Sequence, residues 1–293
     1  MNVLRNWAQT PFDDNLVEYD PRRAHADSCS IALTFDDARL TFVSPDDRSP
    51  LTWSGEAFTS NAGARLPTAS GRPVLLPARA LEFCTQHGLR IPPEKFSDPF
   101  LQYLYLGIVK GGGGEPNSPL SDIWYRRHLQ RSSMLVSDAS GVVVDVGCDD
   151  PKLSRSLFPP SAGYIGFDPT FGSRSEPSLV AMAEFMPFAD ESVDAVSFLT
   201  SLDHILDYHA AIDEAHRILK PGGALYLATL IWTHDAELTR DNIHFHHFRP
   251  FEIDGLLQRF HVENVKRYDW KGNQHRFGAY IKAIKPAIAS DQK

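Results

Sequence analysis

Short apolar runs alternate with amphipathic segments from residue 141 to residue 286, and this alternation limits the possible folds more than any other feature. The first run, residues 141–147 (GVVVDVG), is typical of a strand buried on both faces of a sheet. Further strands are expected at 162–169, 193–201, 224–230, 262–270 and 276–286. Amphipathic helices are expected between them, at 150–158, 207–223 and 249–260. Such repeated units predict an α/β fold with a mostly parallel, doubly wound sheet covered by helices on both faces.

The first half of the chain is less regular. Short β-like runs separated by Asp, Pro and Gly predict a small β-rich unit over residues 31–77. Helices are expected at 77–89 and 97–109, before the glycine-rich break at 110–119. The predicted organisation is an extension at 1–30, a smaller β-rich and helical cap domain at 31–118, a linking helix at 119–137, the sheet domain at 138–286 and a tail at 287–293.

Charge and cysteine content exclude several classes of protein. The net charge of −8 argues against nucleic acid as the main partner, because phosphate binding needs a basic face. Cys29, Cys84 and Cys148 form no Cys-x-x-Cys pair, so neither a zinc cluster nor a disulfide framework is predicted. No signal-peptide-like run and no apolar run of about 18 residues is present. We therefore expect a cytoplasmic protein without a membrane partner, and its oligomeric state stays open.

Ligands of doubly wound sheets bind beyond the carboxyl ends of the strands, which directs attention to the loop after residue 146. Gly147 allows a tight turn there, and the following helix would point its amino end at a bound anion. Asp168 lies 23 residues after Asp145, at the end of the second strand, where an acid can accept hydrogen bonds from ribose hydroxyls. Dehydrogenases share this arrangement, so it does not decide the cofactor.

Residues 183–230 narrow the choice. They contain, in order, Ala183–Phe188 (AEFMPF), Val193–Val196 (VDAV) and His216–Gly223 (HRILKPGG). This block resembles the class I S-adenosylmethionine-dependent methyltransferases, and most closely the group that includes the quinone-biosynthesis methyltransferases. The resemblance covers about residues 138–285. It implies a Rossmann-like sheet of seven strands with an antiparallel last strand at 276–286, and it disfavours a nicotinamide dehydrogenase.

The same resemblance implies S-adenosylmethionine as the cofactor and gives its contacts. Residues around the first loop would frame the methionine end of the cofactor, and an acid would bind the ribose. Two residues would contact the adenine edge, and one more would contact the cofactor through its backbone. In this sequence these positions are Asp145, Gly147, Cys148, Asp149, Asp168, Met182, Ala183 and Leu199.

The loop departs from the family pattern Gly-Cys-Gly-x-Gly. Here it reads Gly147-Cys148-Asp149-Asp150-Pro151, so two of the three glycines are replaced. The Asp149 side chain narrows the space for the methionine carboxylate of the cofactor, and its charge repels that carboxylate unless it turns toward the ammonium group. We still expect the loop to bind the cofactor, because the rest of the block is unbroken.

Histidines are the candidate bases, since methyl transfer needs an aligned nucleophile that often loses a proton. His204 follows the strand at 193–201, and His244 and His246 follow the strand at 224–230. The alternative for each is structural, with the 244–247 segment anchoring the helix at Phe248. No metal site is predicted. Trp124, Tyr125 and His128 on the linking helix either form an aromatic lid or pack in the core.

Residues 40–77 resemble the small zinc ribbons that precede some of these methyltransferases. The four ligand positions would be Ser44, Asp47, Thr59 and Ala62, and none of them is Cys or His. A zinc site is therefore not expected there. A metal-free docking or lid element and an unrelated β-rich cap both remain open.

The main functional hypothesis is a methyltransferase that uses S-adenosylmethionine to methylate an oxygen or nitrogen atom of a small molecule. One alternative is a non-catalytic, methyltransferase-like partner protein, which the depleted glycine loop favours. Another is an enzyme that uses the fold for different chemistry, because a fold alone does not define a reaction. Cofactor affinity separates the first hypothesis from the partner protein, and product analysis separates it from the other enzyme.

Overall fold

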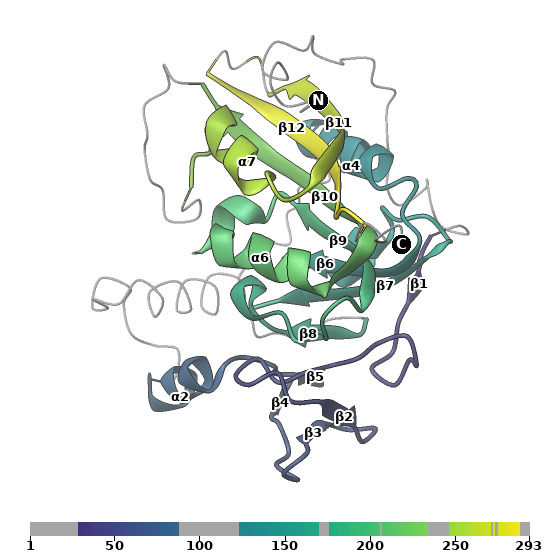
Figure 1. Ribbon diagram of the computed structural model, residues 1–293, viewed down its shortest axis with the longest axis vertical. Coiled ribbons are helices and arrows are strands. Elements are labelled where there is room, and N and C mark those ends of the chain that lie inside the picture. Colours follow the sequence, from purple (N-terminus) through teal and green to yellow (C-terminus); the bar gives the residue numbers. More distant parts are fainter. Residues whose placement is uncertain are drawn as a thin grey trace, which may run out of the picture.

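The computed structural model describes residues 29–87, 123–169, 176–205, 207–233, 246–270, 272 and 275–287. Its centre is an eight-stranded sheet (Figure 1). The strand order is β1 (Ile31–Ala32), β7 (Ala162–Asp168), β6 (Gly141–Val146), β9 (Val193–Leu199), β10 (Leu219–Trp232), β12 (Arg276–Ile284) and β11 (His261–Asp269), and β8 (Ser178–Val180) also pairs with β7.

Strand directions confirm the predicted doubly wound sheet. Strand β12 runs antiparallel to both of its neighbours, β10 and β11, and the other pairings of this sheet are parallel. The sheet has one strand more than the seven expected, because two short strands share the outer edge of β7. Strand β1 pairs with Gly163 and Tyr164, whereas β8 pairs with 166–168.

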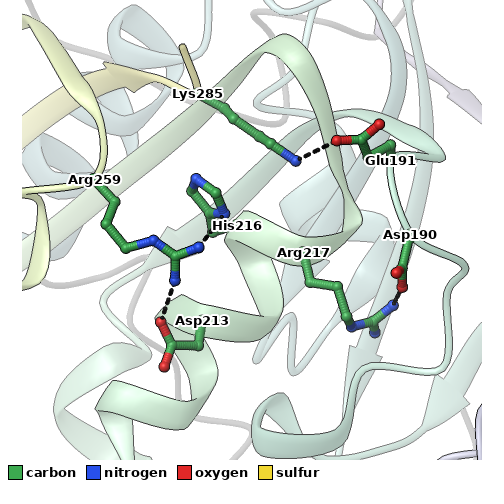
Figure 2. A pocket seen from close by; sticks show the side chains of 7 residues that line it. All are labelled: Asp190, Glu191, Asp213, His216, Arg217, Arg259 and Lys285. Carbon is green, nitrogen blue, oxygen red and sulfur yellow. Dashed lines mark hydrogen bonds and ion pairs between the residues drawn. The ribbon is translucent and has the colours of Figure 1, made fainter. Parts of the chain in front are cut away.

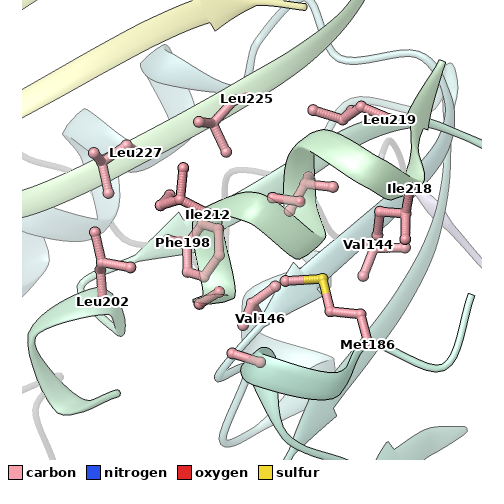
Figure 3. Packing of buried hydrophobic residues seen from close by; sticks show 14 of the residues in the cluster. Val144, Val146, Met186, Phe198, Leu202, Ile212, Ile218, Leu219, Leu225 and Leu227 are labelled. Atoms are coloured by element: carbon pink, nitrogen blue, oxygen red, sulfur yellow. The ribbon is translucent and has the colours of Figure 1, made fainter. Parts of the chain in front are cut away.

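Two cores flank the sheet, one on each face. On one face, helix α6 (Tyr208–Ile218) packs against side chains such as Val144, Phe198 and Leu225 (Figure 3). Helix α7 (Pro250–Leu256) adds Ile253 to the same cluster. On the other face, helix α4 (Ile123–Leu135) packs Leu129 against Val143, Tyr164 and Tyr226. The sheet is therefore covered on both sides, as the alternation of strands and helices predicts.

Local sequence explains where the helices begin. Asp207 caps α6 by accepting a hydrogen bond from the Ala210 amide at 2.9 Å. Asp150 caps the short helix α5 (Pro151–Arg155), with Pro151 in its first turn. Two 3₁₀ turns, η5 (Ala183–Phe185) and η6 (Leu202–His204), lie in the connections on either side of β9. The turn η6 therefore follows the carboxyl end of β9.

The N-terminal part packs on the face that carries α6. It contains the hairpins β2–β3 (Leu51–Trp53, Phe58–Ser60) and β4–β5 (Thr68–Ala69, Arg72–Pro73), followed by helix α2 (Ala78–His87), and lies along the sheet edge at β8 (Figure 1). Phe42 forms a bridge with Phe188, and Val74 forms one with Val180. Leu33, Phe42, Phe58 and Leu75 join the same core cluster as the sheet residues. One continuous core thus connects the two parts.

The four ribbon-like positions lie in or next to the turns and hairpin of this part. The hydroxyl of Ser44 accepts a hydrogen bond from the Asp46 amide at 3.3 Å, and the Asp47 carboxylate accepts one from the Ser49 amide at 3.0 Å. Thr59 donates to the Thr52 carbonyl across the β2–β3 hairpin, and Ala62 follows that hairpin. Within the described ranges, no three His, Cys, Asp or Glu side chains are grouped so that they could hold a metal ion.

Three sequence expectations for residues 97–124 concern parts of the chain that the structure does not describe. The helix expected at 97–109, the glycine-rich break at 110–119 and the side chain of Trp124 lie outside the described residues. The helices that are described include none long and apolar enough to cross a membrane.

Candidate active site

The loop after β6 makes a tight turn that requires glycine at position 147. Gly147 has φ +75°, and a Cβ atom there would lie 2.5 Å from the Cβ of Ser201. Asp149 also has a positive φ, +42°, at a position where the family loop has glycine. The next residue, Asp150, uses its carboxylate to accept the Lys152 amide at 3.0 Å. Helix α5 has only five residues and this acidic cap occupies its amino end, so the anion site that the sequence suggested there stays a prediction.

Asp145 is buried next to the loop, and the residue is 1% exposed. Its carboxylate accepts hydrogen bonds from three hydroxyls: those of Ser154, of Tyr164 at 2.9 Å and of Ser197 at 2.6 Å. Burial raises the pKa of this carboxyl, although the hydroxyls act in the opposite direction. Asp145 therefore supports the loop from below, through neighbouring side chains.

Asp168 ends β7 beside the loop. Its Oδ2 atom accepts a hydrogen bond from the Asp149 amide at 3.3 Å, and the residue is 8% exposed. The structure thus brings the predicted ribose-binding acid and the predicted methionine loop together. The backbone that follows β8 carries Met182 and Ala183, both buried at the same edge.

Cys148 packs away from this edge. A Cβ atom at Gly166 would lie 2.7 Å from the Cys148 sulfur, so the thiol fills the space that this glycine leaves. Burial, and then the nearby Asp168 carboxylate, raise the pKa of the thiol well above its usual value. The side chain is a buried packing group, and the Cys148 amide donates to the Phe167 carbonyl at 3.2 Å.

The end of β9 forms the other side of the edge. Leu199 is half-buried, and its carbonyl accepts a hydrogen bond from the Thr200 hydroxyl at 2.6 Å. Ser201 donates to the Val146 carbonyl at 2.5 Å, which ties this segment to the loop after β6. The turn η6 then places Asp203 and His204 at the carboxyl edge of the sheet.

The three candidate bases differ in their surroundings. The ring of His204 is 37% exposed, and its Nε2 atom lies 3.8 Å from Oδ1 of the buried Asp203. His246 uses Nε2 to donate to the Ile205 carbonyl at 2.8 Å, and its ring packs on Tyr208 and Phe248. This is the anchoring role described above as the alternative. His244 lies outside the described residues.

Helix α4 brings two further side chains to this edge. Burial, and then the charges of Asp149 and Asp150 in the loop, raise the pKa of Tyr125. His128 is buried, with Nδ1 2.7 Å from the Tyr280 hydroxyl and Nε2 3.4 Å from the Thr200 hydroxyl. The spacing of Tyr125, His128 and Ser132 along one helix face is the sequence signal for this placement.

Acid is expected to destabilise the protein through His128. Burial, and then the charge of Arg131, lower its pKa from 6.5 to about 4. The unfolded chain therefore takes up a proton that the folded protein rejects. The contribution of His128 to the free energy of unfolding is complete above pH 6.5. It decreases by about 3 kcal/mol as the pH falls toward 4. Urea unfolding of wild type and His128→Gln from pH 7 to pH 4 measures this difference. Equal pH dependences would contradict the burial of a neutral imidazole.

A polar cavity of about 400 Å³ lies at the opposite edge of the sheet (Figure 2). Its cations are paired: Arg217 with Asp190 at 2.7 Å, Arg259 with Asp213 at 2.9 Å and Lys285 with Glu191 at 3.1 Å. His216, the remaining lining residue, accepts a hydrogen bond at Nδ1 from Arg259 at 3.0 Å. Because the acids balance the cations, we assign this cavity a structural role.

Comparisons with known proteins agree with this geometry. Residues 124–267 match a family model described as a methyltransferase domain. A demethylmenaquinone methyltransferase of Corynebacterium efficiens is 42% identical over 112 residues, which are 36% of this chain and 47% of that protein. Ribosomal RNA-processing protein 8 of Rattus norvegicus is 38% identical over 94 residues, which are 31% of this chain and 18% of that protein. The chain thus spans less than half the length of each of these relatives.

Solved structures are similar at lower identity. A 1,6-didemethyltoxoflavin-N1-methyltransferase of Burkholderia thailandensis, crystallised with S-adenosylhomocysteine, is 14% identical, covers 57% of this chain and 82% of its own chain, and has a TM-score of 0.46. The assignment therefore rests on the family model, on the sequence relatives and on the strand order given above. Residues 124–267, which contain most strands of the sheet, thus match the methyltransferase domain family over about half of the chain.

Proposed function

We propose that the chain binds S-adenosylmethionine at the carboxyl edge of β6, β7 and β9 and transfers its methyl group to an oxygen or nitrogen atom of a small molecule. The match to a methyltransferase domain and the relatives named methyltransferases support this function. The observation that carries it is the hydrogen bond between the Asp149 amide and the Asp168 carboxylate, which joins the cofactor loop to the ribose position.

The side chains at this edge fit the cofactor in one orientation. Asp168 would accept hydrogen bonds from the ribose hydroxyls. The exposed Asp149 carboxylate and the Leu199 carbonyl would face the ammonium group, which turns the cofactor's own carboxylate away from Asp149 and Asp150. When bound, S-adenosylmethionine supplies a methyl group on a positively charged sulfur, which a nucleophile displaces in line.

His204 is the proposed base for the acceptor. It follows β9 at the carboxyl edge, its ring is partly exposed, and the Asp203 carboxylate lies 3.8 Å behind it. A neutral imidazole backed by a carboxylate can accept a proton from a hydroxyl or amine as the nucleophile attacks. His246 supports the site through its bond to the Ile205 carbonyl.

A small acceptor is favoured over nucleic acid. One relative is named for ribosomal RNA processing and another for a quinone precursor, so the relatives alone do not choose between these classes. The net charge of −8 favours a small molecule, because a nucleic acid partner needs a basic face.

Calorimetric titration with S-adenosylhomocysteine and S-adenosylmethionine tests this function. Wild type is expected to bind both, and Asp168→Asn is expected to bind at least tenfold more weakly because it loses the charge that the ribose hydroxyls would meet. Asp213→Asn is the matched control, since its carboxylate is 67% exposed and lies at the opposite edge of the sheet. An equal loss in both variants would contradict the assignment of Asp168.

A non-catalytic partner protein is the second candidate function. The observation that favours it is the pair of acids in the loop, with Asp149 strained at φ +42° and Asp150 occupying the start of α5. This function predicts a folded protein that binds neither ligand. The same titration therefore separates the two candidates.

A further inference from the structure

Four polar groups form a chain of hydrogen bonds between α4, β12 and the end of β9. The Tyr280 hydroxyl lies 2.7 Å from Nδ1 of His128. The other ring nitrogen, Nε2, lies 3.4 Å from the hydroxyls of both Thr200 and Ser132. The Thr200 hydroxyl lies 2.6 Å from the Leu199 carbonyl. His128 and Tyr280 are both buried, so water does not compete strongly for these contacts.

The last contact fixes the direction of the whole chain. A carbonyl oxygen can only accept, so the single proton of the Thr200 hydroxyl goes to Leu199. Thr200 can then only accept from His128, so the tautomer that satisfies this contact carries the imidazole proton on Nε2. Nδ1 is left with a lone pair and accepts the proton of Tyr280. Each bond thus points from the buried core toward the Leu199 carbonyl, and such aligned bonds strengthen one another.

The backbone of Thr200 is strained at the end of this chain. Its φ is +62°, a conformation that β-branched residues rarely adopt. The Thr200 amide donates to the Ala228 carbonyl at 2.8 Å, and the next residue, Ser201, is tied to the loop after β6. Strain of this kind persists only where the surroundings enforce it, and it concentrates at functional sites.

We infer that Thr200 is a positioning residue for the ammonium group of the cofactor, and that Tyr280 and His128 set its orientation. The inference rests on the proposed function. Thr200 controls where the Leu199 carbonyl points, and Leu199 is the residue whose backbone is expected to meet the cofactor. The hydrogen-bond chain therefore makes the contact with the ammonium group depend on Tyr280 and His128, two side chains that do not touch the ligand.

Titration with S-adenosylhomocysteine, whose amino-acid end carries the ammonium group, tests this inference. Thr200→Val keeps the shape of the side chain but loses the hydroxyl, and we expect at least tenfold weaker binding. Thr200→Ser keeps the hydroxyl and is expected to bind within about twofold of wild type. Tyr280→Phe removes the first donor of the chain and is expected to weaken binding severalfold. Tyr226→Phe is the matched control, because this buried hydroxyl on the same face of the sheet bonds to Asp138 instead.

Nitrogen-15 spectroscopy of His128 measures the direction of the hydrogen-bond chain separately from the affinity. The imidazole proton is expected on Nε2 in wild type, and this preference is expected to be lost in Tyr280→Phe. If Thr200→Val and Tyr280→Phe bind as tightly as wild type while Asp168→Asn binds poorly, the inference is wrong and the proposed function stands. If folded wild type does not bind S-adenosylhomocysteine, the proposed function itself fails. If Thr200→Val does not fold, Tyr280→Phe and its proton position decide the question.

Discussion

Replacing Gly147 with alanine is expected to lower the free energy of unfolding by about 2–5 kcal/mol and to abolish cofactor binding. The backbone contributes one part of this loss, because φ is +75° at this position. The larger part is steric, since the new Cβ would lie 2.5 Å from the Cβ of Ser201. Ser201 could move only by giving up its hydrogen bond to the Val146 carbonyl. Urea unfolding and titration with S-adenosylhomocysteine measure the two effects.

Gly222→Ala is the control for the backbone part. Gly222 has a similar φ, +82°, but no atom lies within 4 Å of the Cβ that would be added. Its substitution is expected to cost only about 1–2 kcal/mol. Adding Ser201→Gly to Gly147→Ala removes the collision and is expected to recover part of the stability. Equal losses for Gly147→Ala and Gly222→Ala would show that close packing against Ser201 is not the reason for this glycine.

The long strands could be predicted from the sequence because each is a mostly apolar run of six to nine residues. Strands β6, β7, β9 and β12 all lie where they were expected. The short strands β1 and β8 have two and three residues, which is too few for a pattern. Their pairing with β7 depends on tertiary contacts that bring in Leu33 and Val74 from the first half of the chain.

Helix α5 shows how local geometry overrides a helical pattern. A helix was expected over 150–158, but α5 ends at Arg155. The amides of Ser156, Leu157 and Phe158 bond three residues back instead of four, so the chain tightens into turns before Pro159. Helix periodicity in the sequence does not distinguish these two hydrogen-bond patterns.

The candidate site could be predicted in outline but not in its side-chain directions. The loop at Gly147, Asp168 and the end of β9 were expected together because parallel strands end at one edge. Asp145 was expected to frame the ligand, yet it is buried against three hydroxyls. A strand buried on both faces gives no alternation from which its direction could be read. Two partners of His128, Tyr280 on β12 and Thr200 after β9, are far away in the sequence, so only the fold shows them.

Replacing Arg217 with methionine is expected to lower the free energy of unfolding by about 3–5 kcal/mol. Arg217 contacts both carboxylate oxygens of Glu214, at 2.9 and 2.8 Å, and donates to the carbonyls of Phe188 and Met186. Glu214 is 8% exposed and also accepts from Arg48 at 2.7 Å. Without Arg217 the buried carboxylate would keep only this half-exposed partner and the Met186 amide. Urea unfolding at pH 7 measures the loss.

Arg259→Met is the matched control, because Arg259 lines the same cavity (Figure 2). In its ion pair with Asp213 both side chains are exposed, Arg259 to 54% and Asp213 to 67%. Loss of this pair is expected to lower the free energy of unfolding by no more than about 1 kcal/mol. A double variant, Glu214→Leu with Arg217→Met, is expected to lose less free energy of unfolding than the two single variants together, because no unpaired carboxylate stays buried. If Arg217→Met loses no more free energy of unfolding than Arg259→Met, the buried Arg217–Glu214 pair is not what holds η5 against α6. The expected result gives Arg217 a structural role: it connects α6 to the segment after η5, and its partner Glu214 connects both to the N-terminal part through Arg48.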